Sequence, residues 1–255
     1  MSSTGLQGRG VIVTGAGSGI GRAAALKFAA EGAKVLVADL NPDSAEETVK
    51  AVKDAGGVAQ AVVGDLSDQQ VVDQVVATAM EAFGGVDILV NNAGIMDRMS
   101  ALADTDDAEW QRVIHINLTA PFLLTRAVLP HMLTAGRGSI VFTASEAGLR
   151  GSAAGAAYTA SKHGIVGLVK NLAVMYRKKG IRANAIAPGP TATSIQVDAS
   201  PDAHGPAVIG QLIGSNIGRM GTAEEQAAAI VYLASDAAAF VNGAVLPVDD
   251  GWAAV

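Results

Sequence analysis

Short apolar runs alternate with longer helical patterns along this chain, and that alternation restricts its fold more than any other feature. Several runs, such as VLVA and DILV, are continuously apolar, as is typical of strands buried on both faces of a parallel sheet. Repeated strand–helix–strand units are joined by right-handed crossovers, so the sequence predicts an α/β fold with a doubly wound, parallel, seven-stranded sheet. The predicted strands are 10–14, 34–39, 59–64, 88–91, 139–144, 182–187 and 244–248.

The helical patterns lie between these strands and suggest one continuous unit. They cover residues 20–31 and, approximately, 41–56, 67–83, 107–133, 155–178 and 223–235. Of the 255 residues, 50% are hydrophobic and 16% are charged, which is enough apolar material for a large core. No linker or shift in composition divides the sequence, so we expect residues 1–255 to form a single domain.

One irregular stretch interrupts this regular pattern between residues 188 and 218. It is rich in Gly, Pro, Ser and Asp, and its segment HGPAVIGQLIG resembles a short helix. Insertions of this length in a compact domain are usually functional. We therefore expect a mobile substrate lid at about 190–218, with a plain surface loop as the alternative.

The first predicted strand ends in a glycine-rich turn. Gly15, Gly19 and Gly21 permit a tight strand-to-helix turn, where a pyrophosphate can approach the backbone and the helix N-terminus. Asp39 ends the second predicted strand, close to the spacing of about 20 residues expected of a carboxylate that binds a ribose hydroxyl. Its neighbours Ser18 and Leu40 are neutral, and the carboxylate would repel a 2′-phosphate. The sequence thus predicts NAD(H), with NADP(H) less favoured.

Seven motifs in order resemble the short-chain dehydrogenase/reductase family, of the TGxxxGIG and YxxxK type, over nearly the whole chain. The motifs are TGAGSGIG (14–21), GDL (64–66), NNAG (91–94), HINL (115–118), TAS (143–145), YTASK (158–162) and NAIAPGPTAT (184–193). At the C-terminal end, residues 249–251 read DDG, where the family more often has DGG. The resemblance implies a Rossmann fold and an NAD(P)-dependent oxidoreductase acting on CH–OH groups.

The resemblance also implies roles for individual residues in cofactor binding. Asp65 and Leu66 would contact the adenine, Asn91 and Ala93 would line the cofactor groove, and Gly94 would permit close approach. Residues after the sixth strand would hold the nicotinamide amide and favour transfer of the pro-S hydride, which is the habit of the family. The remaining expected cofactor contacts are Ser18, Ile20, Leu40, Tyr158, Lys162, Pro188, Gly189, Thr191 and Thr193, together with the glycines of the first turn.

Tyr158 and Lys162 are the candidates for acid–base chemistry. They are four residues apart and so are neighbours on one helix face. A free Tyr has a pKa of about 10, and a nearby cation is expected to lower it. Ser145 ends the fifth predicted strand and can stabilise charge on the substrate oxygen. Each pattern alone is common on protein surfaces, but their combination with the glycine turn and Asp39 predicts a catalytic set.

Asn117 is the fourth expected catalytic residue. The family uses an Asn at this position to hold a water on a proton relay that reaches the Lys. Pro121, four residues later, has no N–H, so the carbonyl of Asn117 loses its helical partner and can bind that water.

Substrate-contacting residues are expected in the loops after the fourth and fifth strands and in the lid. The candidates are Ser145 and Tyr158 together with Met96, Glu146 and Ile195, while Asp97 and Arg98 either contact substrate or cap their loop. Apolar lid side chains favour a partly apolar carbonyl or secondary alcohol. Two alternatives remain: a 3-oxoacyl-[acyl-carrier-protein] reductase, and a non-catalytic dinucleotide-binding regulator, which would be expected to lose the Tyr or the Lys.

Composition and charge narrow the expected partners. The net charge of −6 disfavours nucleic acid. The absence of cysteine rules out disulfides and thiolate metal sites, and the four histidines lack metal-like spacing. We expect no signal peptide, no membrane span and a cytoplasmic enzyme. Family members are commonly homotetramers, and we expect the same here.

Overall fold

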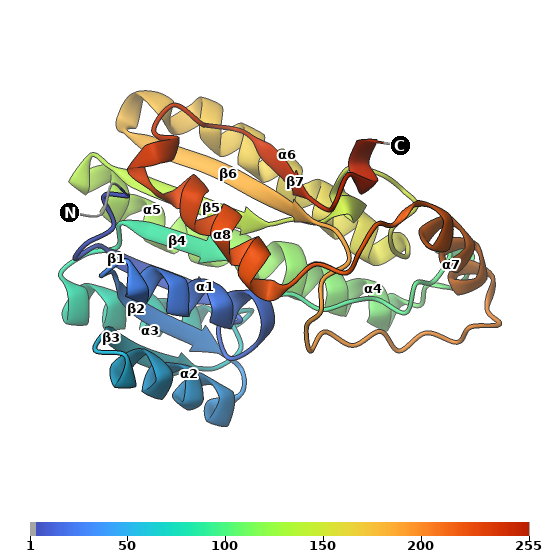
Figure 1. The fold of residues 1–255 in the computed structure, drawn as a ribbon, viewed down its shortest axis with the longest axis horizontal. Helices are drawn as coiled ribbons and strands as arrows, with labels where there is room; N and C mark the ends of the chain where they lie inside the picture. The colour runs from blue at the N-terminus through green and yellow to red at the C-terminus, as the bar shows by residue number, and fades with distance from the viewer. Residues whose placement is uncertain (1–3, 255) are drawn as a thin grey trace.

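A seven-stranded parallel sheet forms the centre of the protein (Figure 1), in the order β3-β2-β1-β4-β5-β6-β7. The computed structural model describes residues 4–254, apart from the side chains of Ser215 and Asn216. The predicted fold class is confirmed, and every predicted strand boundary lies within one residue of the observed one. The strands are β1 (Gly10–Thr14), β2 (Lys34–Asp39), β3 (Val58–Val63), β4 (Ile88–Asn91), β5 (Gly138–Thr143), β6 (Ile181–Pro188) and β7 (Val245–Val248).

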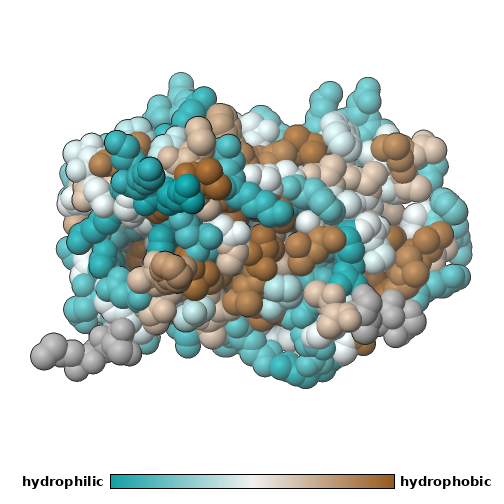
Figure 2. Space-filling model, turned by 90° about the horizontal axis from the view of Figure 1, so that it is seen from above, coloured by the Kyte–Doolittle hydropathy of each residue, from teal (hydrophilic) through white to brown (hydrophobic). Residues whose placement is uncertain are grey.

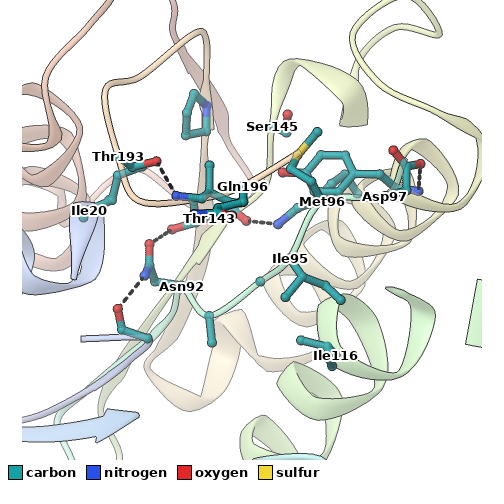
Figure 3. Close-up of a pocket in the computed structure, with 18 of the residues that line it drawn as sticks. Ile20, Asn92, Ile95, Met96, Asp97, Ile116, Thr143, Ser145, Thr193 and Gln196 are labelled. Carbon is teal, nitrogen blue, oxygen red and sulfur yellow. Dashed lines mark hydrogen bonds between the residues drawn. The ribbon is translucent and has the colours of Figure 1, made fainter. Parts of the chain in front are cut away.

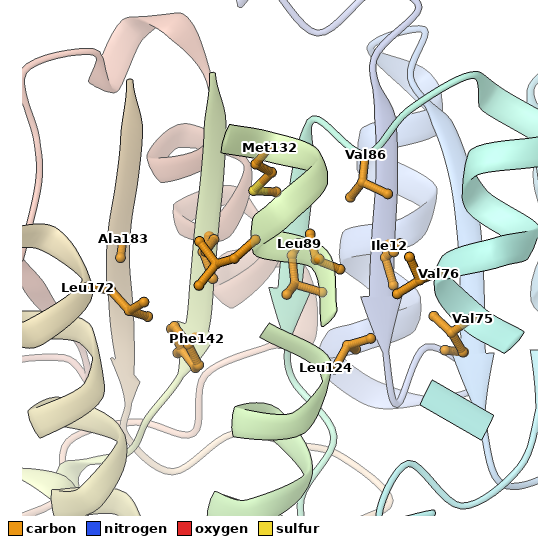
Figure 4. Packing of buried hydrophobic residues seen from close by; sticks show 14 of the residues in the cluster. Ile12, Val75, Val76, Val86, Leu89, Leu124, Met132, Phe142, Leu172 and Ala183 are labelled. Carbon is orange, nitrogen blue, oxygen red and sulfur yellow. The ribbon is translucent and has the colours of Figure 1, made fainter. Parts of the chain in front are cut away.

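Helices cover both faces of the sheet, and each face has its own apolar core. Alternate strand residues point to opposite faces, so Ile12 packs in one core while Val11 and Val13 pack in the other. Figure 4 shows strand residues such as Leu89 packed against helical side chains. One face carries α3 (Gln69–Phe83), α5 (Ala120–Ala135) and α6 (Ala156–Tyr176), and the other carries α1 (Gly19–Ala30), α2 (Pro42–Asp54) and α8 (Ala223–Ala234).

The helix predicted at about 107–133 is not a regular α-helix throughout. It consists of α4 (Asp107–Ile114), a π-helical turn (His115–Thr119) and α5. The N–H of Ala120 donates to the carbonyl of His115, five residues back, so the helix is widened around Asn117. Pro121 follows directly and has no N–H to restore the regular pattern. The helix is thus irregular at Asn117, where Pro121 was expected to remove a helical hydrogen bond.

The same helical stretch, Asp107–Ala135, is long and apolar enough to cross a membrane by length and composition alone. Core helices of globular proteins meet that criterion too. Here the inner face of α5 packs against the sheet through Leu124, Val128 and Met132. This single stretch is therefore weak support for membrane insertion.

The irregular segment after β6 leaves the sheet and returns to nearly the same point. It contains α7 (His204–Asn216), which confirms the short helix predicted there, and α7 stands at the right-hand end of the molecule in Figure 1. Its two ends are joined by backbone hydrogen bonds from Ala192 N to Gly221 O (2.9 Å) and from Gly221 N to Pro190 O (2.8 Å). The segment is therefore a closed loop anchored on the carboxyl end of β6.

Arg182 of β6 fastens the sheet to α8. Its half-buried guanidinium donates to the carbonyls of Leu233 (2.9 Å), Val241 (3.1 Å), Ala234 (3.3 Å) and Ser235 (3.2 Å). The last carbonyls of a helix lack helical partners. Arg182 therefore caps α8 from a neighbouring strand.

We predict that Arg182→Met destabilises the protein by about 2–4 kcal/mol, because several carbonyls lose their donor inside the fold. The melting temperature should fall on the order of 5–10 °C, as measured by thermal unfolding followed by circular dichroism. Arg177→Met, at an exposed position just after α6, is the matched control and should change it little. Equal losses in the two variants would contradict the capping role.

Candidate active site

A cavity of about 1250 Å³ opens at the carboxyl ends of the strands, where ligands bind in open α/β sheets. Figure 3 shows residues from several strand ends and from the lid pointing into it. Gly21, Asn117 and Glu146 are the predicted site residues outside its lining. The predicted residues that do line it are Gly15, Ser18, Gly19, Ile20, Asp39, Leu40, Asp65, Leu66, Asn91, Ala93, Gly94, Met96, Ser145, Tyr158, Lys162, Pro188, Gly189, Thr191, Thr193 and Ile195.

The glycine turn has the geometry expected of a phosphate site. Gly15 and Gly19 have left-handed backbones, with φ of 62° and 50°. A Cβ on Gly21 would lie 2.1 Å from the carbonyl oxygen of Gly15, so only glycine lets α1 start this close to β1. Ser18 precedes α1, and its hydroxyl accepts a hydrogen bond from Ser194 of the lid segment (2.9 Å). The N-terminus of α1 therefore faces the cavity beside the lid.

Asp39 is held rigidly at the end of β2. Its carboxylate accepts hydrogen bonds from the N–H groups of Gly17 (2.7 Å) and Asn41 (3.0 Å). Leu40 beside it is largely exposed. The negative charge is thus fixed next to the glycine turn, which is the placement expected for ribose binding.

Asp65, predicted to contact adenine, lines the same end of the cavity. Its carboxylate accepts hydrogen bonds from the hydroxyl (2.7 Å) and the N–H (2.9 Å) of Ser67. These bonds lower the pKa of Asp65. The carboxylate therefore carries its charge at neutral pH.

Side chains at the ends of β1, β4 and β5 form a hydrogen-bonded floor below the cavity (Figure 3). Thr143 donates to Asn92 Oδ1 (3.0 Å), and Asn92 Nδ2 donates to the carbonyl of Thr14 (3.1 Å). The hydroxyl of Thr14 in turn accepts from the N–H groups of Asn92 (2.9 Å) and Ala93 (3.0 Å). Our sequence interpretation missed Asn92 and Thr143, although both lie inside the NNAG and TAS motifs.

Lys162 is attached to this floor. Its Nζ donates to the carbonyl of Thr143 (2.9 Å) and lies 5.3 Å from the centroid of the Tyr158 ring. The side chain is buried, and burial lowers the pKa of Lys162 to about 8. The helical spacing of Tyr158 and Lys162 thus brings the phenol and the amine together as expected.

The protonation behaviour of Tyr158 differs from the expectation. Burial raises the pKa of Tyr158 to about 12, a hydrogen bond with Ser145 lowers it, and the charge of Asp97 raises it. Lys162 was expected to lower this pKa. Burial disfavours the charged forms of both side chains and dominates the shift of the Tyr158 pKa.

Ser145 and Asn117 are the other two expected catalytic residues. Ser145 follows β5, and its hydroxyl accepts from the N–H of Ala147 (3.1 Å). The buried side chain of Asn117 both donates to the carbonyl (2.8 Å) and accepts from the N–H (2.8 Å) of Ile95. Asn117 therefore fixes the loop after NNAG. A water held by its backbone carbonyl stays a prediction.

Asp97 is a capping residue for a distant helix. Its carboxylate is buried and accepts from the N–H groups of Met99 (2.9 Å), Gly155 (3.2 Å) and Tyr158 (2.9 Å). Gly155, at the start of α6, has no side chain to cap it, and a Cβ there would lie 2.6 Å from the Asp97 carboxylate. Of the two roles considered for Asp97, the structure supports capping.

Glu146 does not face the cavity, although it was predicted to contact substrate. Its side chain is completely buried, with Oε2 lying 3.1 Å from Nε of Arg150. Burial, followed by the charge of Asp249, raises the pKa of Glu146 to about 7. Trp252, which our sequence interpretation missed, lines the cavity instead.

The fold and the glycine turn at the cavity together are those of a Rossmann-type dinucleotide-binding domain. A family model described as short chain dehydrogenase matches residues 9–204. 3beta-hydroxysteroid dehydrogenase 2 of Eggerthella lenta is 40% identical over 98% of this chain and 96% of its own length. Cis-4-hydroxycyclohexanecarboxylate dehydrogenase of Sinomonas cyclohexanicum is 41% identical, covering 97% of each chain.

A solved structure is also similar to this chain over nearly its whole length. It is a crystal structure of a protein from Beutenbergia cavernae with NADP bound at low occupancy. It matches with a TM-score of 0.86 and 40% identity over 98% of this chain and 99% of that one. This chain belongs to the short-chain dehydrogenase/reductase family, whose members bind NAD(P).

We predict that Asp97→Asn shifts the pH dependence of alcohol oxidation. Removal of a negative charge near Tyr158 lowers the pKa of the phenol, so the rate should reach half its maximum at a lower pH. The measurement is kcat/KM against pH with saturating cofactor.

Glu81→Gln, at an exposed acid on α3 outside the cavity lining, is the control and should leave the inflection in place. An unshifted inflection in Asp97→Asn together with a lower kcat would mean that Asp97 acts through capping alone.

Proposed function

We propose that this protein is an NAD-dependent dehydrogenase/reductase that interconverts a secondary alcohol and a ketone. The observation that carries the proposal is the meeting of Ser145, Tyr158 and Lys162 in one cavity that also holds Asp39 and the glycine turn. The open backbone at Gly15 and Gly19 and the fixed carboxylate of Asp39 fit a dinucleotide. When bound, the dinucleotide accepts or supplies a hydride.

Side chains of the protein then transfer the proton and stabilise the charge on the substrate oxygen. In reduction, the hydroxyl of Tyr158 donates its proton to the oxygen that becomes the alcohol, while the hydroxyl of Ser145 donates a hydrogen bond to that oxygen. A pKa raised to about 12 keeps Tyr158 protonated at neutral pH, which suits this direction. Lys162, fixed by Thr143, supplies positive charge when Tyr158 is a phenolate in the reverse reaction.

Preference for NAD over NADP rests on Asp39. The carboxylate is anchored by two backbone donors and cannot swing away from a 2′-phosphate without losing both. Repulsion between the two negative charges would disfavour NADP, and the neighbouring Ser18 and Leu40 bring no compensating charge. A relative of the same fold has NADP bound at low occupancy, so the proposed preference for NAD rests on the local residues of this chain.

The proposed substrate is a partly apolar secondary alcohol or ketone carried on a saturated ring. The relatives named for hydroxysteroids and hydroxycyclohexanecarboxylate act on compounds of that kind. The lid segment at about 190–218, which we propose closes over substrate, contributes the apolar side chains of Ile195, Val197 and Ile213 to the cavity. Retention of Ser145, Tyr158 and Lys162 favours an enzyme over a non-catalytic regulator.

A cytoplasmic homotetramer remains part of the proposal. Strand β7 is an edge strand, and exposed apolar side chains lie on it and near it, including Leu246, Val174, Met175 and Phe240. Figure 2, which views the molecule from above Figure 1, shows hydrophobic side chains gathered in patches across that face. Such patches are typical of protein interfaces.

We predict that Tyr158→Phe lowers kcat by about 100-fold or more, because the proton donor is lost while ring packing is kept. Cofactor affinity, measured by NADH fluorescence titration, should change less than about twofold, since other residues supply most of the binding energy. Tyr176→Phe, at the far end of α6, is the matched control. Substantial turnover by Tyr158→Phe would refute the acid–base role.

We predict that Asp39→Ala weakens NADH binding by roughly tenfold or more, because a charged hydrogen-bond acceptor for the ribose is lost. Affinity for NADPH should rise, since the repulsion is removed as well. The measurement is the ratio of the two dissociation constants in Asp39→Ala and in Asp43→Ala, an exposed acid in the first turn of α2. A ratio that stays the same in Asp39→Ala would refute the ribose assignment.

A further inference from the structure

A buried carboxyl group lies next to the catalytic serine in the chain without facing the cavity. Glu146 directly follows Ser145, and its side chain has no exposed surface. It begins a short helical turn, Glu146–Gly148, in which every residue is buried. Burial of a carboxylate is costly unless charged or hydrogen-bonding groups replace the lost water. Proton transfer by Tyr158 does not use this group, so its burial has another cause.

The same turn sets the direction of the Ser145 hydroxyl group. Ser145 Oγ accepts from the N–H of Ala147 (3.1 Å), and the carbonyl of Ser145 accepts from the N–H of Gly148 (2.8 Å). A Cβ on Gly148 would lie 2.9 Å from the carbonyl oxygen of Lys162, so the turn packs directly on the backbone of α6. A shift of this turn would therefore move the Ser145 hydroxyl relative to Tyr158, with which it is hydrogen-bonded.

The side chain of Glu146 reaches from this turn toward the C-terminal turn. Its Oε2 lies 3.1 Å from Nε of Arg150. The guanidinium of Arg150 in turn lies over the ring of Trp252, 5.7 Å from its centroid, within the range of cation–π attraction. Only 5% of the Trp252 surface is exposed. Glu146 is therefore linked, through one cation, to an indole that packing holds in place.

Asp249 is a second carboxyl group beside Glu146, and its charge acts on Glu146. Its carboxylate accepts from the N–H groups of Gly251 (3.1 Å) and Ala253 (2.5 Å), which fixes the C-terminal turn. A Cβ on Gly189 would lie 2.7 Å from Cα of Asp249, so this turn packs on the backbone that lines the cavity after β6. Two adjacent carboxylates repel each other, whereas a protonated Glu146 can donate a hydrogen bond to Asp249.

The charged groups around Glu146 keep its proton until near neutral pH. Burial, followed by the charge of Asp249, raises the pKa of Glu146 to about 7, and the charge of Arg150 opposes the shift. On α6, the ionisable groups of the site are Tyr158, hydrogen-bonded with the catalytic serine, and Lys162, which donates to a strand carbonyl. β6 contributes one ionisable side chain, the arginine that caps α8.

We propose that Glu146 is a positioning residue, whose proton joins the turn that carries Ser145 to the C-terminal turn through Asp249. This inference rests on the proposed function and deepens it. With the proton present, Glu146 donates to Asp249 beside Arg150, and the Ser145 hydroxyl is aligned with the substrate oxygen. Once the proton is lost, the two carboxylates repel and the turn no longer holds that alignment. Ketone reduction should therefore slow as pH rises through neutrality, through kcat rather than through NADH binding.

The test compares the wild-type enzyme with Glu146→Gln, Glu146→Ala and Glu46→Gln. The amide of Glu146→Gln keeps the shape of the protonated carboxyl group and can donate to Asp249, yet it does not ionise. Glu146→Ala removes the contact at every pH. Glu46, an exposed acid on α2, is the matched control. Each protein is assayed for NADH-linked reduction of cyclohexanone, 4-oxocyclohexanecarboxylate and a 3-oxosteroid across the pH range, with NADH affinity measured in parallel.

We expect kcat of the wild-type enzyme to fall by about fivefold or more between about pH 6 and pH 8, while Glu146→Gln keeps its rate over that range. Ionisation of Tyr158 does not interfere, because its pKa is raised to about 12. Glu146→Ala should have a low kcat at each pH, with NADH affinity within about twofold of wild type. Glu46→Gln should follow the wild-type profile.

Folding stability gives a second readout that does not depend on turnover. A carboxyl group whose pKa is raised in the folded protein adds stability below its unfolded pKa, and this stability is lost as pH rises through about 7. Glu146→Gln carries no such dependence. Its melting temperature relative to wild type should therefore rise, on the order of 3–5 °C, between about pH 5 and pH 8.

The outcomes separate this inference from the function on which it rests. Wild-type turnover of the ketones with parallel pH profiles in wild type and Glu146→Gln would overturn the role of Glu146 and leave the proposed function standing. Equal losses of kcat in Glu146→Gln and Glu146→Ala at low pH would overturn it too, because the amide keeps the donor. Absence of wild-type turnover on all three ketones, with NADH bound, would overturn the proposed function and the role assigned to Glu146 with it.

Discussion

Hydrogen bonds among the side chains at the ends of β1, β4 and β5 provide the support on which the active site is built. Thr14, Asn92 and Thr143 join three adjacent strands at the edge where the cavity opens. The carbonyl of Thr143 then receives the amine of Lys162 from α6. Because parallel strands end together at this edge, one small network supports both the cavity beside the glycine turn and the helix that carries Tyr158 and Lys162.

Burial sets the electrostatics of the site. The pKa of Tyr158 is raised and the pKa of Lys162 is lowered by the same loss of solvent, since each environment disfavours the charged form. Asp97 strengthens the effect on Tyr158 while holding the first turn of α6. The structure therefore favours a protonated phenol near neutral pH.

The substrate side of the cavity is assembled from segments far apart in sequence. The loop after β6 is closed by hydrogen bonds at its base, and the C-terminal turn is tied to its end through Asp250 and Arg219. Asp250 stands where the family more often has glycine, and its carboxylate makes this contact. Its backbone is left-handed, a conformation that glycine adopts more easily. This one departure therefore lies beside the loop that we propose closes over the substrate.

The sequence by itself determined the strands, the glycine turn and the spacing of Tyr158 and Lys162, because periodicity and short spacings are local properties of the chain. It also placed Asp39 correctly at the end of β2. Only the tertiary structure decided that Asp97 caps α6, that Glu146 is buried and that Trp252 lines the cavity. These outcomes, like the direction of the Tyr158 pKa shift, depend on burial and on contacts between distant segments, which exist only once the elements pack together.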